Sequence, residues 1–247
     1  SILAMVVGCF SKAVYIPFLA LYWLMPKDKF YSRRQKNLFK AGIFVLLILM
    51  FASFILPLIG NVTSGAEVGD YRGGDTSQTS QLSMILGYPL TYTGVLLKSL
   101  GTTFASYFIG SKVLANFAYR GIYDGIGYFV VLLMMVFTFV TDFGMTEKTY
   151  DAQMKRKILM MKIWNAVLIF GTACLVWTAL YLDFTPVGSM VINGVSPRYY
   201  LPLIFPLSLI FINQKVRCSM KLENYQSLIA FLMLIGTGIS IYCLMLA

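Results

Sequence analysis

The sequence contains no histidine, and only ten of its 247 residues are Asp or Glu. Histidine is the side chain that exchanges protons near neutral pH, and it is the commonest metal ligand in proteins. Its absence excludes Ser–His triads and the usual histidine-based metal sites from this stretch of chain. The four cysteines, Cys9, Cys174, Cys218 and Cys243, form no Cys-x-x-Cys pair, so their spacing predicts neither a zinc site nor a disulfide framework.

Charge is scarce as well, since 12% of the residues are charged, 58% are hydrophobic and the mean hydropathy is +0.75. This composition lies far outside the range of soluble domains and indicates an all-α, polytopic membrane protein. A helix needs about 20 apolar residues to cross a bilayer core. We expect about six spans, at Ile2–Met25, Ala41–Ile59, Gly125–Thr141, Ile158–Leu180, Tyr199–Ile212 and Tyr225–Met245.

The positive charges orient these spans. The segments 26–40, 146–162 and 214–221 carry six, five and three of the 20 Lys and Arg residues. By the positive-inside rule these loops are cytoplasmic, which predicts a multi-pass protein of the plasma membrane with both ends of this chain extracytoplasmic. Cations in short loops serve topology and contact with anionic lipids, whereas a nucleic-acid-binding protein would carry a basic soluble face.

The chain starts at Ser1 and enters an apolar run at once. That run is too long for the core of a signal peptide and has no basic leader. We therefore expect residues 1–247 to be a single transmembrane domain that forms the C-terminal part of a longer protein. Residues 60–124 are predicted to be an extracytoplasmic loop, in which amphipathic helices lie on the outer membrane face.

Polar side chains gather in the first part of this loop, at Asp70, Arg72, Asp75, Gln78 and Gln81. Carboxylates and amides among glycines can bind sugar hydroxyls or, through oxygen ligands, a divalent cation. A solvated turn held by Asx hydrogen bonds would use the same residues. Both readings stay open from the residues alone.

Two cations stand apart from the basic loops. Lys12 lies inside the first predicted span, with Tyr15 on the same expected helical face, and can contact an anionic substrate or pair with an acid elsewhere in the protein. Arg198 follows Pro197 at the outer end of the fifth span. Its guanidinium can grip a phosphate through two hydrogen bonds, or it can snorkel to the interface beside Tyr199 and Tyr200.

Four stretches resemble a family of bacterial multi-spanning proteins related to the GT-C glycosyltransferases. They are SKAVYIPFLALYWLMPKDKF, GDTSQTSQLSMILGYPLTYTGVLLKSL, RGIYDGIGYF and INGVSPRYYLPLIFPL, in this order. The pattern is a Lys-x-x-Tyr span that ends in a proline and a basic loop, a Gln-x-x-x-Ile/Leu-x-x-x-Pro outer helix, a Gly-x-x-Asp entry into the next span and a closing Gly-Arg-Tyr-aromatic-x-Pro motif. One departure is Pro197, where that family usually has glycine before the arginine.

The resemblance implies transfer of a sugar from a polyprenyl-phosphate carrier to a cell-surface glycopolymer on the outer membrane face. Arg198, Tyr199 and Arg72 would then bind the lipid phosphate, and Asp70, Asp75, Gln78 and Gln81 would face the sugar or acceptor. The catalytic acid is expected upstream of Ser1, so the catalytic residue is not assigned. A transporter or flippase of lipid-linked saccharides, or a non-catalytic membrane subunit, are the alternatives.

Overall fold

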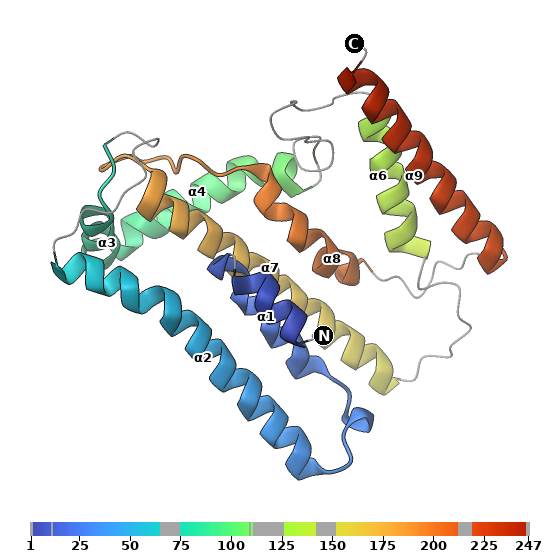
Figure 1. Ribbon diagram of the computed structural model, residues 1–247, viewed down its shortest axis with the longest axis horizontal. Helices are drawn as coiled ribbons and strands as arrows, with labels where there is room; N and C mark the ends of the chain where they lie inside the picture. Colours follow the sequence, from blue (N-terminus) through green and yellow to red (C-terminus); the bar gives the residue numbers. More distant parts are fainter. Residues whose placement is uncertain are drawn as a thin grey trace. The chain divides into compact units, whose positions relative to one another are not determined.

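The computed structural model describes residues 2–10, 12–64, 75–108, 110, 126–141, 152–211 and 219–245. All regular structure in these ranges is helical (Figure 1). The α-helices are α1 (Ile2–Phe10), α2 (Arg33–Ser64), α3 (Gln78–Gly87), α4 (Pro89–Phe108), α6 (Ile126–Thr141), α7 (Ala152–Phe184), α8 (Leu201–Ile210) and α9 (Leu222–Met245). Three 3-10 helices are η1 (Ala13–Leu24), η2 (Lys27–Lys29) and η6 (Pro197–Tyr200).

The chain divides into two compact units. The first contains residues 1–101 and 167–195, and the second contains residues 102–166 and 196–247. The helices α4 and α7 each run from one unit into the other.

The first predicted span is wrong as a single helix. The structure has α1 up to Phe10, an extended residue at Lys12 (φ −148°, ψ 100°), and then η1, which packs against α1. Pro17 lies inside η1 and has no N–H to donate, so an α-helical bond cannot form there. Lys12 is exposed at the junction whereas Tyr15 is buried, so the two side chains do not share a helical face.

Two of the described helices are long and apolar enough to cross a membrane: Arg33–Asn61 within α2 and Gln153–Phe184 within α7. Ala13–Leu24 and Tyr128–Phe139 are shorter apolar helices. Both long helices continue beyond the apolar runs that predicted them, and α7 gains a last turn up to Phe184. The last turn of α7 carries a carboxylate, Asp183.

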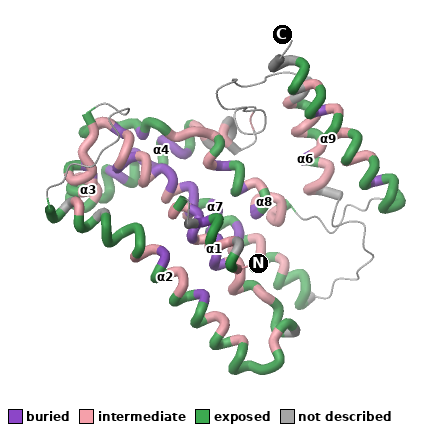
Figure 2. Tube along the Cα trace, viewed as in Figure 1, coloured by how far each residue is buried: buried purple, intermediate pink, exposed green. Residues whose placement is uncertain are grey.

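Buried residues of the first unit recur on η1, α4 and α7. Ile16 and Leu19 on η1 are fully buried, and Figure 2 shows buried positions recurring along α7. On α4 the buried residues recur every three or four positions, at Tyr92, Val95, Leu96, Ser99 and Leu100. This spacing is that of an amphipathic helix, the character that the sequence predicts for this segment.

In the second unit, α6 packs along α9. The rings of Phe137 and Tyr225 stack with centroids 5.4 Å apart. At the other end of the pair, the Val130 side chain lies against Gly236. Because the earlier residue of α6 meets the later residue of α9, the two helices run antiparallel.

A loop follows α7 in the first unit and turns at two glycines with left-handed backbone, Gly188 and Gly194, both at φ 79°. The surroundings of the two differ. A Cβ atom on Gly194 would overlap the ring of Phe184, the last residue of α7, whereas one on Gly188 would meet nothing within 4 Å. The loop therefore returns to the end of α7 closely enough that only glycine fits at residue 194.

We predict that Gly194→Ala destabilises the protein more than Gly188→Ala. Both variants carry the cost of a left-handed alanine, about 1–2 kcal/mol, and only Gly194→Ala adds an overpacking cost of about 1–3 kcal/mol. The measurement is the apparent midpoint of thermal unfolding of the full-length protein in detergent. Equal midpoints for the two variants would show that the loop does not rest on Phe184.

Candidate functional site

The candidate site lies in the first unit, where the start of α3 meets the end of α7. Ser77 caps α3, since its hydroxyl oxygen accepts a hydrogen bond from the Ser80 N–H at 3.4 Å. Gln78 and Gln81 follow at a spacing of three residues, which places both side chains on one face of the helix. That face is directed at α7, and both glutamines donate hydrogen bonds to it or to the residues just after it.

Gln81 is fully buried. Its side-chain Nε2 donates to the backbone oxygen of Thr185 at 2.9 Å and to that of Pro186 at 3.0 Å. Because both partners are carbonyls, the donating end of the amide must face them, and the orientation of the side chain is fixed. The Oε1 atom of Gln81 is buried and has no hydrogen-bond partner among the described residues.

Gln78 binds the carboxylate of Asp183. Its Nε2 donates to Asp183 Oδ1 at 2.5 Å, and its own Oε1 is buried with no partner among the described residues. A hydrogen bond to an ionised acceptor is stronger than one between neutral groups. Two buried amide oxygens are thus left without a partner among the described residues, and a buried acceptor of this kind calls for a donor from water or a ligand.

The backbone around the cluster is held by further hydrogen bonds. The Thr185 hydroxyl donates to the Leu180 oxygen at 3.1 Å and accepts from the Asn193 N–H at 3.1 Å. The Val187 N–H donates to the backbone oxygen of Asp75 at 3.1 Å. The carboxylate-bearing residue Asp75 is itself exposed, so the segment just before α3 is tied to the loop after α7 while its acid faces outward.

A second contact holds α3 and α4 to α7 one turn further along. The hydroxyls of Tyr92 and Thr178 lie 2.6 Å apart, and the Tyr181 hydroxyl donates to the sulfur of Met84 at 3.1 Å. The rings of Tyr92 and Tyr181 are 5.1 Å apart. Burial raises the pKa of Tyr92 above its ordinary value, so this hydroxyl stays protonated and the contact is neutral at physiological pH.

The chemistry of the cluster is that of a hydrogen-bond acceptor. Its groups are the Asp183 carboxylate and the two buried glutamine oxygens. Such a set suits hydroxyl groups, which donate, and disfavours phosphate, which carries only negative charge and acceptor oxygens at neutral pH. Among the described residues, no three His, Cys, Asp or Glu side chains gather as a metal site.

The structure brings together part of the predicted site. Gln78 and Gln81 meet at α7, and Asp75 lies next to them in sequence. Asp70 and Arg72 lie outside the described residues.

The predicted phosphate-binding residues Arg198 and Tyr199 belong to η6 in the second unit. Arg198 is exposed, and its guanidinium carbon lies 5.9 Å from the centroid of the Tyr199 ring. The exposed guanidinium is accessible to an anion at the start of α8, where the chain turns from Ser196 into helix.

Sequence reasoning missed Asp183 and Thr185. Their partners in α3 lie more than one hundred positions away in sequence, and the apolar run that marks α7 stops before them. One signal was present: Asp183 is one of only ten acidic residues, and it lies just after the apolar run 158–180.

Comparison of the sequence with models of known protein families finds a match. A family model described as predicted membrane protein (DUF2142) matches residues 1–207. No curated protein and no solved structure matches the chain.

We predict that Gln81→Met lowers the stability of the protein. Methionine has nearly the shape of glutamine but cannot donate, so the carbonyls of Thr185 and Pro186 lose a buried partner. Such a loss costs about 1–3 kcal/mol. The measurement is the thermal midpoint of the full-length protein in detergent, with Ser83→Ala as the control.

Ser83 is an exposed residue of the same helix, and its hydroxyl bonds within α3 to the Ser80 oxygen. Its removal therefore leaves the midpoint nearly unchanged. A Gln81→Met protein as stable as Ser83→Ala would contradict the structural role of the amide.

Proposed function

The chain belongs to this family of predicted membrane proteins, and we propose that it is part of a bacterial membrane glycosyltransferase of GT-C type. In this proposal about six spans cross the plasma membrane, and both ends of the chain are extracytoplasmic. The enzyme transfers a sugar from a polyprenyl-phosphate carrier to a cell-surface glycopolymer on the outer membrane face. The cluster at the end of α7 holds the sugar or the acceptor.

The observation that carries the proposal is the pair of glutamines bound to the end of α7, where Gln78 donates to Asp183 and Gln81 donates to the Thr185 oxygen. Sugars are recognised through hydroxyl groups, which donate to carboxylate and amide oxygens of this kind. The basic start of α7, at Lys155, Arg156 and Lys157, is at the opposite end of the same helix. Because Lys155 and Asp183 are 28 residues apart, the helical rise separates them by about 42 Å, so the positive-inside rule puts Asp183 on the outer face.

The phosphate of the carrier needs a cation, and the acceptor-rich cluster supplies none. Arg198 is the exposed guanidinium that fits this role, with Tyr199 beside it and Arg72 as a second cation. In the transfer, the bond between the sugar carbon and the phosphate oxygen breaks, and the acceptor hydroxyl oxygen bonds to that carbon. A general base takes the hydroxyl proton, and the arginine stabilises the leaving phosphate.

We predict that Arg198→Ala abolishes transfer, whereas Arg198→Lys restores it in part, because lysine keeps the charge but loses the bidentate grip. The full-length gene is deleted in its host and replaced by each variant, and linkage analysis of the cell-surface glycopolymer is compared with the protein level in membranes. Arg156→Ala is the control, since it removes the same charge at the basic end of α7. A normal glycopolymer with Arg198→Ala would contradict the phosphate role.

We also predict that Asp183→Asn reduces glycopolymer synthesis while leaving the protein stable. Asparagine keeps an oxygen that can accept from Gln78, so the packing of α3 on α7 remains, but the charge is lost. Hydrogen bonds to charged groups contribute about 1.5–3 kcal/mol, which corresponds to at least about a tenfold loss of activity. Normal synthesis with Asp183→Asn would show that the cluster is purely structural.

A further inference from the structure

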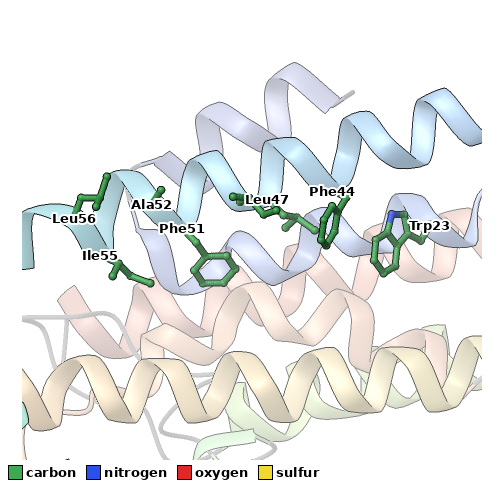
Figure 3. Close-up of a pocket in the computed structure, with 8 residues that line it drawn as sticks. Trp23, Phe44, Leu47, Phe51, Ala52, Ile55 and Leu56 are labelled. Atoms are coloured by element: carbon green, nitrogen blue, oxygen red, sulfur yellow. The ribbon is translucent and has the colours of Figure 1, made fainter. Parts of the chain in front are cut away.

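An apolar groove lies along α2 in the first unit, beside the end of η1. It has a volume of about 510 Å³, and every side chain that lines it is apolar. Trp23 of η1 stands at one end, and Phe44, Leu47, Phe51 and Ile55 follow one another along α2 (Figure 3). These positions recur every three or four residues, so they form one continuous stripe on the helix.

Aromatic packing closes the end of the groove nearest the start of α2. The Trp23 ring stacks on Phe44 at 6.3 Å, and its indole N–H donates to the Lys40 oxygen at 3.4 Å. Phe39, on the same turn of α2, lies between the rings of Tyr22 at 6.5 Å and Phe30 at 5.2 Å. This packing joins η1 to α2 and fixes the position of Trp23 over the groove.

Cations continue the stripe beyond the aromatic end. Lys36 and Lys40 precede Phe44 at a spacing of four residues each, so they lie on the same side of α2 as the groove. Both are only half-exposed, and the cations Lys27, Lys29, Arg33 and Arg34 lie close by in sequence. Asp28 is the one acid among residues 26–40, against six Lys and Arg residues. Like charges this close repel one another unless an anion lies among them.

The length of the groove matches one leaflet of a bilayer. From Phe44 to Ile55 the helix rises about 17 Å, and half of the hydrocarbon core is about 15 Å thick. The groove also lies in a helix that is long and apolar enough to cross a membrane, in a chain of a membrane protein family. A hydrocarbon chain that starts at the basic end of α2 and stops near the middle of the bilayer fits a groove of this length and lining.

We propose that this groove binds an acyl chain of an anionic phospholipid, whose phosphate lies between Lys36 and Lys40. The cations select the headgroup, and the stripe from Phe44 to Ile55, with Ala52 beside it, takes the chain. The proposal is independent of the sugar site and of any transferase activity.

The test uses the full-length protein in liposomes that contain a phosphatidylglycerol with a photoactivatable diazirine in its acyl chain. A parallel sample contains phosphatidylcholine with the same labelled chain, and the labelled residues are mapped by peptide mass spectrometry. Each lysine near an anionic headgroup contributes about 1 kcal/mol, so we expect labelling of residues 44–56 to favour phosphatidylglycerol by at least about tenfold. Equal labelling by the two lipids would overturn the proposal.

Two variants separate the headgroup from the chain. The double variant Lys36→Gln, Lys40→Gln removes the preference and leaves equal labelling by both lipids, whereas the matched control Lys155→Gln, Lys157→Gln at the start of α7 keeps it. Ala52→Phe fills the groove and lowers labelling of residues 44–56 by both lipids. A preference for phosphatidylglycerol that survives the first double variant, or is lost equally in the control, would also overturn the proposal.

Discussion

The side-chain amide of Gln81 holds the end of α7 in place. The last carbonyls of any helix, and those just beyond it, lack partners within the helix and must find them elsewhere if they are buried. Gln81 satisfies the oxygens of Thr185 and Pro186, and the Thr185 hydroxyl satisfies that of Leu180. Once Gln81 is seated, Gln78 one turn earlier meets Asp183. One buried amide thus fixes both the fold of the loop and the geometry of the cluster.

Cations and the Asp183 carboxylate occupy separate places along the long helices α2 and α7. On α2 the cations gather in the first two turns, beside the apolar groove, and on α7 they gather at the start, with Asp183 at the end. Acceptor oxygens such as those of Asp183 receive hydrogen bonds from hydroxyl groups, whereas phosphates need donors and cations. A helix long enough to span a bilayer, such as α7, therefore carries groups of opposite charge at its two ends.

The sequence predicts helix class and length well where an apolar run ends at a polar residue. The starts of α6 and α9 lie within a few residues of the predicted ones, and α4 shows the amphipathic face expected of it. The prediction of one helix for the first span was wrong because hydropathy measures apolar content and carries no information on backbone geometry. The run therefore looked like an unbroken helix although it contains Lys12 and Pro17. The sequence predicted part of the cluster, namely Gln78 and Gln81. It did not predict Asp183, because tertiary packing brings this partner to Gln78 and no local sequence pattern encodes that contact.

The 3-10 form of η1 determines the length of this element. A 3-10 helix rises about 2.0 Å per residue against 1.5 Å for an α-helix, so its twelve residues are about 6 Å longer than they would be in α form. Rewinding this element would draw its two ends together and turn its side chains around the axis. The stacked indole of Trp23 and the thiol of Cys9, which donates to the Tyr15 oxygen at 3.3 Å, clamp opposite ends of it. Contacts at both ends of η1 therefore hold the length of this element.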